Sequence, residues 1–152
     1  MALVPFFLVL SNSRPLFGFL LGFIFGVAFY TGIFFWMFDL PKYRVLHHAV
    51  LGVYLCPLTG LFGLIYCIIA RRWKITAALL AVPFLWVVQE YFRSNFFFLS
   101  LPWGLLAHSQ YQHPVIIQIA SLTGTWGISF LIVLVNSALT AVIFRLTHRG
   151  KY

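Results

Sequence analysis

The sequence predicts an all-α integral membrane protein: a multi-span bundle of about four full transmembrane helices and one partial helix, with an irregular outward-facing segment at the interface. Hydrophobic residues make up 62% of the 152-residue chain and charged residues only 8%, whereas soluble domains carry about a quarter charged residues. Two runs, Pro15 to Phe38 and Val45 to Ala70, contain no Asp, Glu, Lys or Arg, and about 20 residues suffice to span a membrane. We therefore expect lipid around most of these side chains.

Turn residues between the apolar runs divide the chain into successive spans of one transmembrane domain, 1–152. A partial span covers 2–10, because its apolar run is too short to cross a membrane, and no basic residue precedes it as in a signal peptide. Short turns join the first three full spans, so these neighbours should be antiparallel. The full spans are expected at about 16–38, 46–70, 75–91 and 127–144.

Small and polar residues inside the spans predict how the helices meet. Gly18, Gly22 and Gly26 recur every four residues, so they share one helix face and should let another helix approach closely. Asn136 in the last span is expected to form an interhelical hydrogen bond. Cys56 and Cys67 are about 16 Å apart along one helix, too far for a disulfide, so we interpret both as small packing side chains.

The distribution of charge predicts the orientation in the membrane. The net charge is +8, with Asp39 and Glu90 as the only acids, but the positive residues sit at the ends of apolar runs and form no face that could follow phosphates, so we expect no nucleic-acid partner. The positive-inside rule places the turns after residues 10 and 70 and the C-terminal tail in the cytoplasm. Segment 92–126 is then on the outward side, which is the periplasmic side in a bacterial inner membrane. The seven positives on the cytoplasmic side are Arg14, Arg71, Arg72, Lys74, Arg145, Arg149 and Lys151.

The segment 92–126 is the candidate functional region. Loops of this length in a compact protein are usually functional or disordered, and this one is rich in aromatic side chains, of which Trp103 and Tyr111 suit the membrane interface. His108 and His113 flank polar residues but lack a third metal ligand nearby, and no nucleophile and base pair is evident. We therefore expect no catalytic residue, no metal site and no cofactor.

A carboxylate and a guanidinium close the third full span. Glu90 and Arg93 are three residues apart, so on a helix they can meet. A carboxylate near lipid is costly and marks a functional position by default. Two alternatives stay open at this point: an ion pair that pins the helix end, or a pair of groups that grips a polar head group.

Several pieces of the chain, in order, resemble the membrane domain of the apolipoprotein N-acyltransferase family. An early stretch, "GVAFYTGIFFWMF", is similar to that family's Gly-rich span ending near a Trp, and "LWVVQEYFRS" to its Trp-rich span ending in Glu and Arg. The stretch "LPWGLLAHSQYQHP" is similar to its Pro-Trp and Ser-Gln segment, and "IQIASLTGTWGISFLIVLVN" to its Gln, Thr-Gly and Val-Asn segment. The resemblance covers nearly the whole chain.

The resemblance implies a bacterial inner-membrane enzyme with two lipid substrates. In the family, a Cys takes an acyl chain from a membrane phospholipid as a thioester and passes it to the amino group of the diacylglyceryl-cysteine of a lipoprotein. The catalytic Glu, Lys and Cys belong to a nitrilase-like domain that should follow, and no position here matches them, Cys56 and Cys67 included. The chain is thus expected to be a fragment or a shortened relative that is non-catalytic alone.

Residues of the outward segment are then expected to bind substrate. Beneath the catalytic domain they would form part of a floor or entrance, with Glu90 and Arg93 bracing it or meeting a head group. His108 stands where the family usually has Tyr or a similar residue. The segment residues concerned are Trp103, His108, Gln110 and Tyr111.

Two other functions compete with this interpretation. A free-standing, non-catalytic membrane protein that binds lipid or a partner protein would have the same composition. A small transporter or channel should carry ionisable groups inside its spans, and all ten Lys and Arg lie at span ends.

Overall fold

The computed structural model describes residues 2–97 and 100–147, which form helices and turns without a β-strand. The predicted all-α class is therefore confirmed. The elements, in chain order, are α1 (Val4–Ser11), α2 (Pro15–Ile33), the 3-10 helix η1 (Phe35–Asp39), α3 (Val45–Arg72), α4 (Ile75–Asn95), the 3-10 helix η3 (Leu106–Gln110), α5 (Pro114–Ile117) and α6 (Ala120–Thr147).

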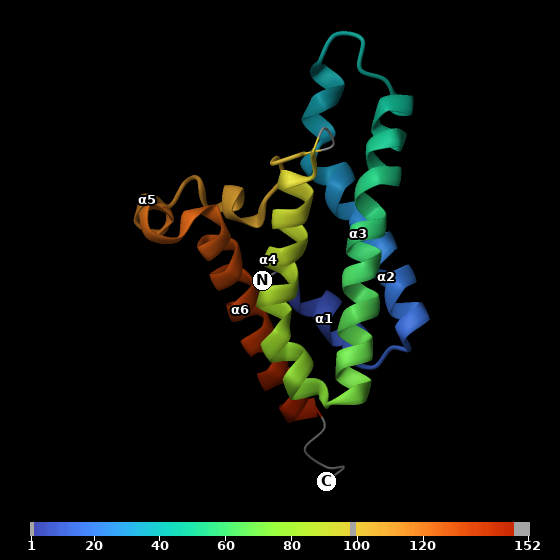
Figure 1. Cartoon of the computed structure of the whole chain (residues 1–152), viewed down its shortest axis with the longest axis vertical. Coiled ribbons are helices and arrows are strands. Elements are labelled where there is room, and N and C mark those ends of the chain that lie inside the picture. Colours follow the sequence, from blue (N-terminus) through green and yellow to red (C-terminus); the bar gives the residue numbers. More distant parts are fainter. Residues whose placement is uncertain (1, 98–99, 148–152) are drawn as a thin grey trace.

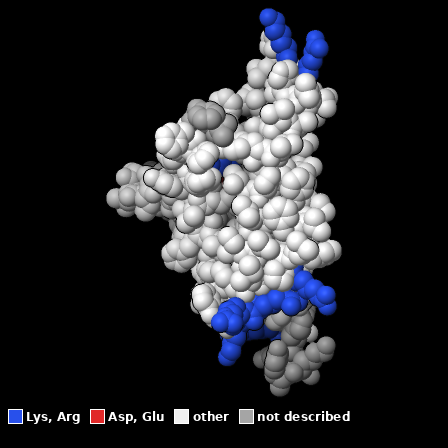
Figure 2. Space-filling model, turned by 45° about the vertical axis from the view of Figure 1, so that its right-hand side comes forward, with Lys and Arg blue, Asp and Glu red and all other residues white. Residues whose placement is uncertain are grey.

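Four helices of the described chain, α2, α3, α4 and α6, are long and apolar enough to cross a membrane. They run alternately up and down along the long axis of the molecule (Figure 1). Helix α1 has eight residues, which rise only about 12 Å, so it extends along part of the bundle. Lys and Arg gather at the two ends of the face shown in Figure 2, and the surface between them is almost free of charge. This distribution is typical of a bundle that has lipid around its middle.

Helices α2 and α3 form the most extensive helix pair in the described residues. The predicted glycine face makes this contact, since Gly18, Gly22 and Gly26 are all buried. A Cβ atom at Gly22 would collide with the carbonyl oxygen of Thr59 on α3, and one at Gly63 with the carbonyl oxygen of Gly18. Backbone therefore lies against backbone, and the packing role expected for these glycines is confirmed.

Helix α1 packs onto the bundle through large apolar side chains. Phe7 and Leu10 are buried in a core cluster with Tyr66 of α3 and Trp86 of α4. The hydroxyl groups of Ser11 and Tyr66 lie 2.7 Å apart and share a hydrogen bond. These contacts join α1 to α3, and α1 also packs against α6.

Some boundaries and one contact differ from expectation. The region 16–38 is divided between α2 and η1, α4 continues past 91 to Asn95, and α6 begins at Ala120 with a kink at Gly124. The expected interhelical hydrogen bond of Asn136 is wrong: its amide donates to the carbonyl of Ile132 in its own helix at 2.7 Å, and its oxygen is buried without a partner. One helical turn brings that carbonyl within reach, so the donor is satisfied locally.

Candidate functional site

The loop between α4 and α5 comprises residues 96–113, and its described parts, 96–97 and 100–113, fold back over one end of the bundle (Figure 1). The amide of Leu101 donates to the carbonyl of Arg93 at 2.9 Å, which returns the loop to the helix it has just left. Gly104 has a φ of +70°, and a Cβ there would lie 3.0 Å from Ile33 and 3.3 Å from Phe34 at the end of α2. A glycine is favoured because the backbone is left-handed and close to its neighbours.

Arg93 holds the first half of this loop. It is 1% exposed, and its guanidinium donates to the carbonyl oxygens of Trp103 at 2.5 Å and Gly104 at 3.4 Å. Its Cζ atom also lies 5.5 Å from the centre of the Tyr30 ring on α2, within range of a cation–π interaction. One side chain of α4 thus joins the loop and α2.

Glu90 holds the second half of the loop. It is 3% exposed, and its Oε1 atom accepts hydrogen bonds from the Trp86 indole at 3.0 Å and from the amide of Leu106 at 2.8 Å. The next amide, of Ala107, donates to the hydroxyl of Ser129 on α6 at 3.1 Å. The start of η3 is therefore attached to both α4 and α6.

Glu90 and Arg93 do not hydrogen-bond to each other. Each directs its bonds to the loop instead, so of the roles considered from the sequence, bracing is the one that the observed contacts perform. Each side chain also has one buried polar atom without a hydrogen-bond partner, Oε2 in Glu90 and Nε in Arg93. Gln89 and Ser94 on the same helix each add another such atom.

A hollow of about 420 Å³ lies between the loop and the end of α2. The rings of Trp103 and Trp36 are 6.1 Å apart across it, and Trp103 is 50% exposed. His108 is exposed at its border. The hollow therefore combines apolar walls with indole and imidazole nitrogen atoms, a mixture suited to binding an amphipathic molecule. Its lining residues are Ile33, Phe34, Trp36, Trp103, Gly104 and His108.

The predicted substrate-binding residues therefore occupy three places. Trp103 and His108 line the hollow, whereas Glu90 and Arg93 lie beneath the loop. Gln110 and Tyr111 are outside the hollow: the amide of Gln110 donates to Ser109 at 2.9 Å, and Tyr111 is 72% exposed.

Two residues of this region were not singled out from the sequence. Trp86 precedes Glu90 by one helical turn, and that spacing could have suggested their hydrogen bond. Trp36 ends an apolar run on the same side of the predicted topology as Trp103, which is a weaker signal.

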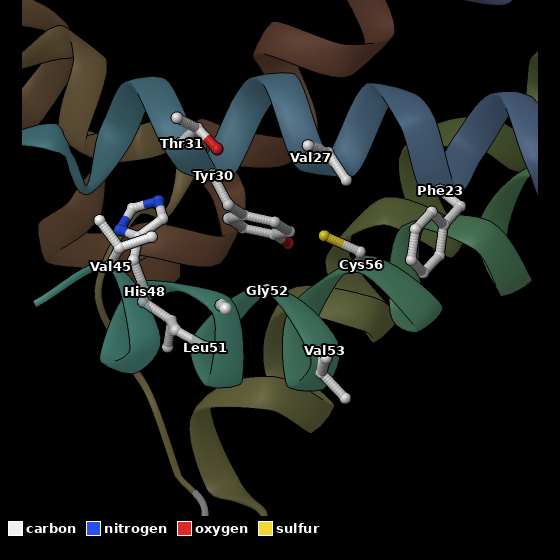
Figure 3. A pocket seen from close by; sticks show the side chains of 11 residues that line it. Phe23, Val27, Tyr30, Thr31, Val45, His48, Leu51, Gly52, Val53 and Cys56 are labelled. Carbon is white, nitrogen blue, oxygen red and sulfur yellow. The ribbon is translucent and has the colours of Figure 1, made fainter.

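A second hollow, of about 310 Å³, opens between α2 and α3. Figure 3 shows Tyr30 of α2 and Cys56 of α3 reaching into it, between apolar side chains such as Val27 and Val53. Tyr30 also lies against Arg93, so this groove is connected to the loop through the Arg93 side chain. The described residues include no group of three His, Cys, Asp or Glu placed to hold a metal ion.

Four membrane-length helices, with an aromatic loop held across one end, define a polytopic membrane protein. The sequence model described as the apolipoprotein N-acyltransferase N-terminal domain matches residues 1–138. The chain therefore belongs to the apolipoprotein N-acyltransferase family, as expected from the sequence.

Several bacterial apolipoprotein N-acyltransferases are similar to this chain in sequence. An apolipoprotein N-acyltransferase from Geobacter metallireducens is 35% identical over 148 residues, covering 93% of this chain and 28% of the relative. Apolipoprotein N-acyltransferase 1 of Treponema denticola is 27% identical over 143 residues, covering 94% and 25%. One from Coxiella burnetii is 30% identical over 146 residues, covering 87% and 29%. The chain spans about a quarter of the length of these relatives, and no solved structure matches it.

Proposed function

We propose that this chain acts as the membrane domain of an apolipoprotein N-acyltransferase and that the 96–113 loop positions lipid substrates. The observation that carries the proposal is the double brace of Glu90 and Arg93, which holds Trp103 beside Trp36 at the end of the bundle. A fixed, half-exposed indole pair at the interface can contact both the apolar chains and the polar ester region of a lipid. A loop that only joined α4 to α6 would not need two buried charged side chains.

The chain's own contribution is binding and orientation. Acyl transfer from a phospholipid to a lipoprotein requires a nucleophile and a base, and the hollow beside Trp103 contains only His108 among ionisable side chains. The two cysteines are buried within α3, and the Cys67 thiol donates to the main-chain carbonyl of Leu10, so both fit the role of packing side chains. We therefore assign the covalent steps to the catalytic Glu, Lys and Cys of a nitrilase-like domain, and the holding of lipid beside that domain to the loop.

We place the 96–113 loop on the periplasmic side of the inner membrane. The positive-inside rule supports this orientation, since Arg71, Arg72 and Lys74 occupy the opposite end. The test is the labelling of a Ser109→Cys variant in intact cells. The reagent is a maleimide that passes the outer membrane but not the inner membrane. Ser109 is exposed, whereas Cys56 and Cys67 are buried, so the unmodified chain is the control. Labelling that requires opening of the inner membrane would contradict the orientation.

The proposed role is tested in a chimera in which this chain replaces the matching region of the Geobacter metallireducens relative. The chimera should support N-acylation of lipoproteins in cells depleted of their own enzyme, and Trp103→Ala should lower that activity about tenfold or more, while the amount of membrane-inserted protein stays constant. This chain alone should show no acyl transfer. Turnover by the chain alone would overturn the assignment of the chemistry to another domain.

The matched control is Tyr111→Ala. Tyr111 is an exposed aromatic residue of the same loop region but lies outside the hollow, so its loss should change acylation much less. Equal effects of both variants would show that the hollow is not the lipid site. If both variants and the unmodified chimera retain equal activity, the loop only connects helices.

A further inference from the structure

We infer that a pocket at the end of the bundle opposite the 96–113 loop binds the phosphate-bearing head group of an anionic phospholipid. This hollow, of about 970 Å³, is formed where α3 ends, α4 begins and α6 ends. The inference concerns a different site from the proposed function and does not depend on it. The cationic residues that line the pocket are Arg71, Arg72, Lys74 and Arg145.

Four cationic side chains line this pocket, and no acidic residue does. The chain has only two acids: Asp39 belongs to η1, near the opposite end, and Glu90 is buried beneath the 96–113 loop. The side chain of Arg71 is directed across the pocket margin, since its Nε donates to the carbonyl of Ser13 at 3.3 Å. Figure 2 shows Lys and Arg gathered at the lower end of the molecule. Positive charges are thus concentrated here, and among the described residues no Asp or Glu side chain lines the pocket to balance them.

The start of α4 increases this imbalance. Its N-cap residue is Lys74, no side chain caps its first turn, and that turn contains no acid. A helix N-terminus carries partial positive charge and uncapped amide groups, so a cation there is unfavourable. Basic residues at the ends of α3 and α6 offset the dipoles of their own helices, but that does not explain why Lys74 stands at the start of α4. An anion in the pocket would stabilise all of these groups together.

The walls of the pocket favour a lipid over a free phosphate ion. Ala70, Ile75 and Phe144 provide apolar surface beside the cations, where the first methylene groups of acyl chains can lie. Trp73 is 66% exposed, as is typical of indole rings at the level of lipid head groups. Basic pockets between transmembrane helices at a membrane surface bind anionic head groups. The volume also exceeds that of one phosphate group.

The test measures lipid binding to the full chain in detergent by native mass spectrometry. Phosphatidylglycerol and phosphatidylcholine with identical acyl chains are compared, with inorganic phosphate as a competitor. The unmodified chain should bind phosphatidylglycerol at least tenfold more tightly than phosphatidylcholine. A double variant, Lys74→Gln with Arg145→Gln, should weaken phosphatidylglycerol binding about fivefold for each charge removed. Arg71 is left unchanged because it also contacts Ser13.

The matched control is Arg14→Gln with Lys42→Gln, which removes the same charge from exposed positions that do not line the pocket. This control should bind phosphatidylglycerol like the unmodified chain. Equal binding of the two lipids, or equal losses in both double variants, would overturn the inference. If inorganic phosphate at the same concentration as the lipid displaced phosphatidylglycerol completely, the pocket would be a site for phosphate ions. That result would also overturn the inference.

A measurement on the unmodified chain decides the matter if the double variant does not fold. Raising the salt concentration from about 0.05 M to about 0.5 M shortens the range of electrostatic attraction. The affinity for phosphatidylglycerol should then fall towards the affinity for phosphatidylcholine. A preference unaffected by salt would contradict a head-group site built on charge.

Discussion

The guanidinium of Arg93 donates to the main-chain carbonyl of Trp103 at 2.5 Å, and this bond joins the last turns of α4 to a half-exposed aromatic residue of the proposed lipid site. The contact is made to the main chain, so it fixes the position of the loop and leaves the Trp103 ring available. Three residues earlier, Glu90 binds the amide of Leu106. A cation thus binds carbonyl groups and an anion binds an amide, each complementary to the loop atom it meets.

Replacing Arg93 should release the loop. Arg93→Ala leaves two carbonyl groups without their charged donor, and we expect a loss of about 1.5–3 kcal/mol in the free energy of unfolding for each strong bond to a charged group. The measurement is unfolding in mixed detergent micelles, with limited proteolysis to detect cleavage within 96–113. Arg14→Ala, at an exposed position, should change stability by less than about 0.5 kcal/mol. Equal stability of the two variants would show that the brace contributes nothing.

Glu90 offers a test of hydrogen bonding separated from charge. The amide oxygen of Glu90→Gln can still accept from Trp86 and Leu106, whereas Glu90→Ala leaves both donors unpaired, at about 1–3 kcal/mol for each buried group. We therefore expect Glu90→Ala to be clearly less stable than Glu90→Gln in the same unfolding measurement. The opposite order, or no difference, would mean that the carboxylate acts through its charge alone or not at all.

The contact between α2 and α3 predicts different results for two glycines of one helix. At Gly22 an added methyl group meets the backbone of Thr59, which cannot move aside, whereas at Gly32 it meets nothing within 4 Å. Gly22→Ala should cost about 1–3 kcal/mol through overpacking. Gly32→Ala should be neutral or stabilise by up to about 1 kcal/mol, because alanine favours helix. Similar unfolding midpoints for the two variants would contradict the close approach.

Gly104 tests the geometry of the loop itself. Its φ of +70° disfavours any side chain by about 1–2 kcal/mol, and a Cβ would press against Ile33. Gly104→Ala should therefore destabilise the protein and expose the loop to protease. Gly52→Ala serves as the control, because the only atom near an added Cβ is the Cys56 sulfur at 4.0 Å. A loop that stays protected in Gly104→Ala would show that this turn does not fix its position.

The bundle was predictable because its causes are local in sequence. Apolar runs longer than a bilayer is thick become helices wherever they occur, since a backbone in lipid must satisfy its own hydrogen bonds. The spacing of Gly18, Gly22 and Gly26 identified a contact face without its partner, which proved to be α3. The same reasoning did not apply to Asn136, because a carbonyl one turn earlier competes with any neighbouring helix.

The candidate site was only partly predictable for the opposite reason. Trp103 and His108 were recognised as interfacial residues by type, but the contact of Trp103 with Trp36 depends on how the end of α2 meets the loop. Spacing left an ion pair between Glu90 and Arg93 as one of two alternatives, whereas both side chains bind the loop. The carbonyl and amide groups of a loop can also bind charged side chains, and the spacing of residues on a helix does not predict such partners.

The sequence alone determined that lipid surrounds the long helices and how many of them there are, since hydropathy is a sum over consecutive residues. Only the tertiary structure decided which groups the buried charges bind and which aromatic rings meet. Those partners lie on segments separated along the chain, and their approach depends on the packing of every helix between them.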